Sequence, residues 1–168
     1  MSEFRINIEE AFNPKPNETY IGLINIDRPP FHLVTIANLK QFSWEVEKSR
    51  IGESIDSLLR HLNKDGTRCV FLKISEDPSV YDHVEAAYRN STNTQTCIDP
   101  INGFLNSLVK KRVKNPLTIF ELMEFLNGQP NWTASFGLNL DSEEIKLEIY
   151  DRYAVNRHVR GLQQNSAA

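Results

Sequence analysis

The chain has 168 residues, of which 40% are hydrophobic and 24% are charged, and these values predict one globular domain over residues 1–168. The 19 basic and 22 acidic side chains give a net charge of −3, unlike the clearly basic balance of a nucleic-acid-binding domain, so we expect no nucleic-acid partner. Two cysteines are too few for a disulfide framework, and we find neither a secretory signal nor an apolar run of ~20 residues. We therefore expect a cytoplasmic protein with no integral membrane segment.

The first part of the chain is typical of strands. Residues 1–18 are expected to form a short lead-in, because Pro14 and Pro16 interrupt regular structure. Apolar and β-branched residues predict strands over 20–26, 31–37 and 42–46. Only the short segment 38–41 separates the last two strands, so we expect them to pair antiparallel.

Helices and strands alternate in the next segment. Ser54 is a suitable N-cap, because its hydroxyl can accept a backbone N–H, and apolar residues follow it at helical spacing to Leu62. Residues 69–74 are apolar and β-branched enough for a strand, and residues 78–89 carry another apolar stripe at helical spacing.

The C-terminal part predicts one helix and a hairpin. Thr118 and Glu121 match a capping box, so a helix is expected to start there and to end at 127–128. Apolar residues alternate over 136–140 and 145–149, which predicts a C-terminal β-hairpin, and 161–168 should form a mobile tail. Together the elements predict an α+β fold in which a small antiparallel sheet packs with helices.

Several familiar motifs are missing from the sequence. We find no Walker A loop, Gly-x-Gly-x-x-Gly, Cys-x-x-Cys, His-Glu-x-x-His or Gly-x-Ser-x-Gly, and the four histidines have no metal-ligand spacing. We therefore expect no cofactor and no metal ion.

Cys97 is the candidate nucleophile. It follows the polar loop 90–96 and precedes residues 98–108, which have helical spacing, so it should lie at or near a helix N-terminus. A helix N-terminus stabilises a thiolate and thereby lowers the pKa of a cysteine. The other cysteine, Cys69, begins an apolar strand and is expected to pack in the core.

His32 is the candidate base for such a thiolate. It leads an apolar strand, and Ser43 and Glu45 occupy the polar side of the strand that should pair with it. Either side chain could orient the imidazole ring. A strand-end histidine that bonds locally, beside a solvent-facing polar stripe, remains the alternative interpretation. His61, His83 and His158 have polar neighbours and are expected at the surface.

The order of these parts resembles the circularly permuted papain-like hydrolases, the NlpC-type group that includes lecithin:retinol acyltransferase-like proteins. The resembling segments are His32-Leu-Val-Thr-Ile, Phe42-Ser-Trp-Glu-Val, Arg50-Ile51-Gly52 leading to Ile55–Leu62, Arg68–Ile74, Val84-Glu-Ala-Ala-Tyr88 and Thr96-Cys-Ile-Asp-Pro-Ile101. The resemblance covers roughly residues 20–109 and implies a permuted papain-like arrangement of the fold.

The resemblance implies a thiol-dependent hydrolase or acyltransferase. Cys97 would attack an amide or ester carbonyl, His32 would transfer the proton, and Ser43 or Glu45 would hold the ring. The substrate would be a peptide, a protein or an acyl lipid. The alternative is a non-catalytic interaction or binding protein with a similar α+β fold, and the sequence predicts no particular oligomeric state.

Overall fold

The computed structural model of the chain describes residues 3–28, 32–45, 48–90, 96–108, 134–141, 144–148, 157–158 and 160–164. The strands, in chain order, are β1 (Glu3–Asn7), β2 (Glu10–Ala11), β3 (Thr19–Ile24), β4 (His32–Ala37), β5 (Lys40–Ser43), β6 (Arg50–Ser54), β7 (Cys69–Ser75), β8 (Ala134–Leu138) and β9 (Glu144–Glu148). The helices are α1 (Ile55–Asp65), α2 (Val80–Arg89) and α3 (Asp99–Leu108).

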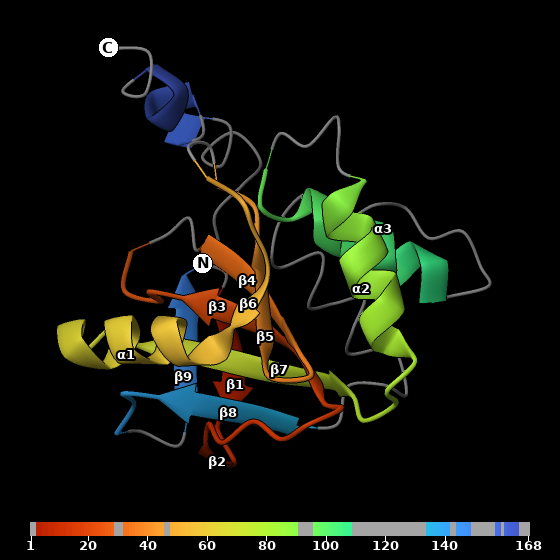
Figure 1. The fold of residues 1–168 in the computed structure, drawn as a ribbon. Helices are drawn as coiled ribbons and strands as arrows, with labels where there is room; N and C mark the ends of the chain where they lie inside the picture. Colours follow the sequence, from red (N-terminus) through yellow and green to blue (C-terminus); the bar gives the residue numbers. More distant parts are fainter. Residues whose placement is uncertain are drawn as a thin grey trace.

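A seven-stranded sheet forms the centre of the molecule (Figure 1). Its order is β2-β8-β7-β3-β4-β5-β6, and its pairings are antiparallel except for the parallel pair β2–β8. Strands β1 and β9 form a separate two-stranded sheet. The predicted α+β class is confirmed, but the sheet is larger than expected.

The predicted C-terminal hairpin is wrong, although both of its strands exist. Strand β8 lies between β7 and β2, and β9 pairs with β1 instead of with β8. Alternation of apolar residues identifies a strand and its buried face, but it does not say which strand lies beside it. Two hydrogen-bonding edges of β8 are already taken, so β9 finds its partner elsewhere.

The predicted lead-in, residues 1–18, contains β1 and β2, so residues 3–7 and 10–11 join the sheets. Ile6 of β1 is buried and pairs with Ile145 of β9, and Glu10 of β2 pairs with Phe136 of β8. Pro14 and Pro16 follow these strands instead of preventing them. Residues 161–164, within the predicted tail 161–168, are helical. The helix predicted from Thr118 lies outside the described residues.

The helices cover opposite faces of the sheet (Figure 1). On one face, α1 packs Ile55 and Leu62 against Val34 and Ile36 of β4. On the other face, α2 and α3 pack against strand residues that include Leu33, Val70 and Leu72. The buried helix residues of this cluster are Val80, Val84, Tyr88, Ile101, Phe104 and Leu105. Successive residues of a strand point to opposite faces, so β4 contributes to both layers.

Helix α1 begins where the sequence predicts. The Ser54 hydroxyl accepts a hydrogen bond from the Asp56 backbone N–H, and Gly66 ends the helix with a left-handed backbone at φ 63°. The helices predicted at 78–89 and 98–108 are confirmed as α2 and α3. Among the helices that the structure describes, none has the length and apolar character needed to cross a membrane.

A tight turn sets the register of β4 and β5. Asn38 and Leu39 have positive φ angles of 49° and 62°, which matches the two-residue hairpin turns that suit twisted strands. The strained Leu39 is held because its carbonyl accepts a hydrogen bond from the N–H of Ile55 at the start of α1. The turn places Val34 opposite Ser43, and this register determines which side chains meet at the far end of the hairpin.

Candidate functional site

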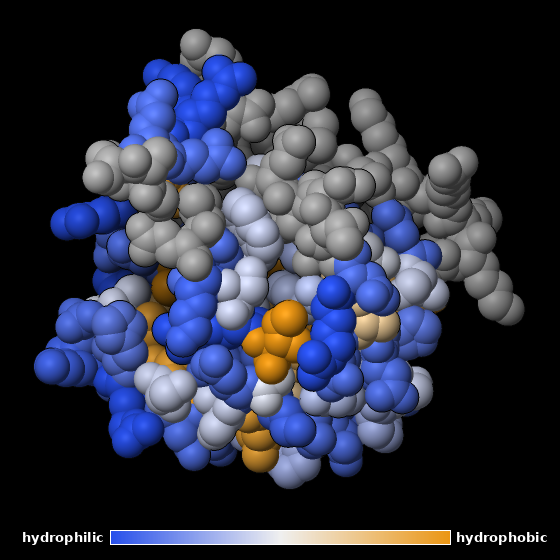
Figure 2. All heavy atoms as spheres, turned by 45° about the horizontal axis from the view of Figure 1, so that its top comes forward, coloured by the Kyte–Doolittle hydropathy of each residue, from blue (hydrophilic) through white to orange (hydrophobic). Residues whose placement is uncertain are grey.

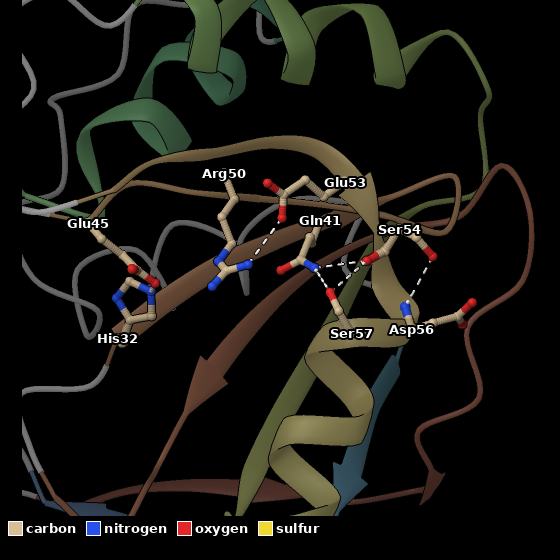
Figure 3. Close-up of polar contacts among 8 residues, drawn as sticks. All are labelled: His32, Gln41, Glu45, Arg50, Glu53, Ser54, Asp56 and Ser57. Carbon is tan, nitrogen blue, oxygen red and sulfur yellow. Dashed lines mark hydrogen bonds and ion pairs between the residues drawn. The ribbon is translucent and has the colours of Figure 1, made fainter.

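The β4–β5 hairpin brings three of the predicted site residues to one face of the sheet. Val34 pairs with Ser43, so His32 and Glu45, each two residues further along, lie beside one another on the same side. The His32 Nε2 and Glu45 Oε1 atoms are 3.6 Å apart, which is an ion-pair distance rather than a hydrogen bond (Figure 3). Of the two residues proposed to orient the ring, Glu45 is the one paired with it.

The environment of His32 favours its neutral form. Burial lowers the pKa of the imidazole below 6.5, because the charged ring loses hydration. The Glu45 carboxylate raises the pKa, but only in part, and His158 lowers it further. Within the described residues, the buried Nε2 atom of His32 has no hydrogen-bond partner.

His32, Ser43 and Glu45 line a cavity of about 790 Å³ between the sheet and α1. The volume lies within the range of small-molecule sites, roughly 300–1,000 Å³. The other lining residues come from the end of β3 and the turn after it, from β4 to β6, from α1 and the loop that follows it, and from the C-terminal helical segment. They are Ile24, Asn25, Arg28, Val34, Gln41, Arg50, Ser57, Leu58, His61, Leu62, Asp65, Thr67 and His158.

Ser43 differs from the other polar side chains of this wall. It is only 2% exposed, and its Oγ atom has no hydrogen-bond partner in the part of the chain that the structure describes. Gln41, two residues earlier on β5, is equally buried, but its Nε2 atom donates to the Ser54 carbonyl at 2.8 Å and to Ser57 Oγ at 2.9 Å (Figure 3). Gln41 therefore serves the start of α1, whereas the Ser43 hydroxyl has no such structural bond.

Arg50 forms an ion pair at the cavity but keeps N–H donors that could bind a ligand. Arg50 Nη1 lies 3.1 Å from Glu53 Oε2, and Glu53 is not among the lining residues (Figure 3). His61 Nε2 lies 3.5 Å from Asp65 Oδ2, with 73% of the His61 side chain exposed. A guanidinium has five N–H donors, so one ion pair does not saturate Arg50.

Cys97 packs on the other side of the sheet. It lies two residues before α3, where the Asp99 carboxylate accepts a hydrogen bond from the Thr96 N–H at 3.0 Å. The residue is partly exposed, yet burial of the thiol raises its pKa to about 11. A reactive thiolate needs a lowered pKa, so this environment works in the opposite direction.

The structure does not bring Cys97 and His32 together. Cys97 packs against the cluster that contains Leu33, on the face where the Thr35 Oγ1 and Tyr88 hydroxyl oxygens are 2.9 Å apart. His32 instead lines the cavity with Val34, on the face covered by α1. Because adjacent residues of a strand point to opposite faces, the sheet separates the thiol from the imidazole.

The remaining cysteine is buried, and His83 and His158 lie at least partly at the surface. Cys69 is fully buried at the start of β7, as predicted, and burial raises its pKa to about 11. His83 is partly exposed and its Nδ1 lies 3.0 Å from Ser107 Oγ. His158, predicted as a surface residue, is exposed and lines the cavity.

The sequence interpretation missed Arg50 and His158 as lining residues. Arg50 belongs to the unpredicted strand β6, and His158 comes from a distant segment without any local signal. Among the described residues, no three His, Cys, Asp or Glu side chains are grouped as metal ligands. Comparison with protein-family models, curated proteins and solved structures found no match, so any functional conclusion must come from the side chains described above.

Proposed function

We propose that this chain is a non-catalytic binding protein whose ligand site is the cavity beside His32. The observation that carries this proposal is that the side chains of two neighbouring β4 residues point to opposite faces of the sheet. His32 faces the cavity, whereas Leu33 faces the cluster in which Cys97 packs. A thiol hydrolase needs its base within hydrogen-bond reach of the sulfur, and the sheet stands between the two groups.

The surface also favours a small polar ligand over a large apolar partner. Of the residues coloured by hydropathy in Figure 2, most are hydrophilic, and the hydrophobic side chains form separate spots. Among the described residues, Leu162 is the large hydrophobic side chain with substantial exposure, at 42%. The cavity, by contrast, combines a few apolar residues with several polar groups, as small-molecule sites do.

The second candidate is the thiol-dependent hydrolase or acyltransferase, with a permuted papain-like arrangement. The specific observation in its favour is the pairing of His32 with Glu45, which provides a base and an orienting carboxylate. The order from β4 through α2 to Cys97 and α3 also agrees with the resemblance. For this function, Cys97 and His32 would have to meet in a state different from the described one.

The pH dependence of Cys97 alkylation separates the two functions. Iodoacetamide labelling would be followed by peptide mass spectrometry in the original chain, in His32→Ala and in the control His83→Ala. For a binding protein, labelling should accelerate only as the pH approaches about 11, in line with the raised pKa of a buried thiol. The profile should be the same in all three proteins, because neither histidine acts on the thiol.

A different profile would support the hydrolase. Rapid labelling of Cys97 near neutral pH, with a shift to higher pH in His32→Ala but not in His83→Ala, would contradict the binding-protein proposal. Circular dichroism would verify that both variants are folded. His83 is a suitable control because it lies on α2, where its ring contacts Ser107, and it is not among the residues that line the cavity.

A further inference from the structure

We propose that the cavity binds a small molecule carrying an oxyanion, either a carboxylate or a phosphate, and that His32 becomes protonated when this ligand binds. The inference rests on the proposed function, because it names the ligand class of the same cavity. It is carried by three side chains, His32, Ser43 and Arg50, which come from three adjacent strands.

The strand register places these three side chains in one row. Ser43 of β5 pairs with Val34 of β4 on one side and with Arg50 of β6 on the other. Cross-strand partners point to the same face of a sheet, and His32 lies two residues from Val34, so it shares that face. The hydroxyl, the guanidinium and the imidazole are therefore directed to one wall of the cavity.

Two of these groups are left without the bonds that buried polar groups normally make. In the described part of the chain, neither Ser43 Oγ nor His32 Nε2 has a hydrogen-bond partner. A buried polar group without a hydrogen bond destabilises the folded state. Two such groups beside a cavity therefore suggest that a ligand supplies the bonds. A ligand oxygen that accepts from the Ser43 hydroxyl and from a protonated His32 ring would supply both bonds.

The cavity gains positive charge when His32 is protonated, and the charge of that state favours an anion. Its charged and titratable lining groups are Arg28, Arg50, His32, His61 and His158 on the basic side, and Glu45 and Asp65 on the acidic side. Glu45 and Asp65 are each paired with a histidine of the same cavity, at 3.6 Å and 3.5 Å. Arg50 then offers its remaining donors in the fork geometry that suits carboxylate and phosphate groups.

Ligand binding and protonation of His32 must be coupled. Burial lowers the pKa of His32, with Glu45 opposing and His158 assisting the shift, so the ring is neutral near pH 7. An anion beside the ring favours the imidazolium form and raises the pKa of His32. By linkage, the anion then binds more tightly as the pH falls.

The test is an NMR titration of the complete chain with three probes: acetate, inorganic phosphate and the neutral molecule glycerol. We expect saturable shifts at His32, Ser43 and Arg50 with the two anions but not with glycerol. Acetate keeps its charge between about pH 6 and about pH 8, so its affinity should be several-fold higher at the lower pH, with a raised His32 pKa in the bound state.

Two variants and one matched control locate the anion. Arg50→Gln and Ser43→Ala should each weaken acetate binding by about fivefold to tenfold, because each removes a donor to the oxyanion. Arg89→Gln should leave the affinity unchanged, since Arg89 is likewise an arginine in an ion pair, with Glu85, but lies on α2 and does not line the cavity. Amide chemical-shift dispersion would verify folding, and Ser43→Ala keeps the test decisive if Arg50→Gln misfolds.

Three results would overturn the inference. These are the absence of saturable anion binding at the cavity, an equal loss of affinity in Arg89→Gln and Arg50→Gln, or an affinity for acetate that does not change with pH. Glycerol binding without anion binding would reject the oxyanion and leave the binding-protein proposal intact. The Cys97 alkylation profile tests that proposal separately, so the two failures can be told apart.

Discussion

On the α2–α3 face of the sheet, the buried hydroxyls of Thr35 and Tyr88 satisfy each other at 2.9 Å, whereas on the α1 face the buried hydroxyl of Ser43 has no partner among the described residues. Thr35 and Ser43 lie on paired strands and are both at most 2% exposed. Burial is therefore not what distinguishes the two faces. Of these hydroxyls, the pair on the α2–α3 face helps to complete the core, whereas that of Ser43 lies at a cavity.

The largest expected effect is on the α2–α3 face. Phe104 is fully buried on α3, so Phe104→Ala should lower the free energy of unfolding by about 3–5 kcal/mol, through lost contacts and a new void. Leu58 is only partly buried and already borders the cavity, so Leu58→Ala should cost less than about 2 kcal/mol. Urea denaturation measures both changes. Equal losses would break the comparison by showing that the α1 face is packed as tightly.

A smaller effect is expected from Glu18, a buried acid whose bonds are all made within the protein. Its carboxylate accepts from the Tyr20 hydroxyl at 2.6 Å, from Lys73 Nζ at 3.1 Å and from the Lys15 N–H at 3.0 Å. Burial alone would raise the pKa of Glu18, but these hydrogen bonds outweigh it and hold the pKa below 4.5. The charged form is thus favoured by folding.

The stabilisation from Glu18 is present above pH 4.5 and is lost as the pH falls through the lowered pKa of the folded state. We expect Glu18→Gln to reduce the free energy of unfolding by about 1.5–3 kcal/mol at neutral pH, and the difference from the original chain to shrink in acid. Urea denaturation over a series of pH values measures this. A difference that stays constant below pH 4.5 would contradict the assignment.

The smallest expected effect on stability comes from removing single hydroxyls on the paired strands β4 and β5. Thr35→Val removes the buried hydrogen bond between the Thr35 and Tyr88 hydroxyls and should cost about 1–2 kcal/mol. Ser43→Ala removes a hydroxyl that has no protein partner in the described residues, so stability without ligand should change by less than about 0.5 kcal/mol. Thermal or urea denaturation of the two variants sharpens the comparison. A larger loss in Ser43→Ala would mean that its hydroxyl already serves the fold.

The sequence was sufficient for the elements that depend on local chemistry. Ser54 caps α1 as its hydroxyl predicts, Cys69 is buried on β7, and the two-residue turn brings Glu45 beside His32. In each case a residue type together with a period of two or 3.6 determines the outcome. The α+β class follows from the same patterns.

The sequence was insufficient where the outcome depends on partners distant in the chain. A helical pattern after Cys97 predicts α3, but it does not say which face of the sheet α3 covers, and this choice separates Cys97 from His32. Likewise, the alternation of apolar residues identified β8 and β9 as strands but not the strands with which they pair. Arg50 and His158 reach the cavity through tertiary packing, which leaves no local pattern to recognise.

The pairing of β1 with β9 also constrains how the chain can be made. Ile6 has its partner at Ile145, and Glu10 has its partner at Phe136, so the beginning of the chain must wait until most of it has left the ribosome. Closing loops of this length is entropically unfavourable and delays the contacts that close them, as in proteins of high contact order. The hairpin β4–β5 can form early. We therefore expect the central strands to assemble first during synthesis, with β1 and β2 joining last.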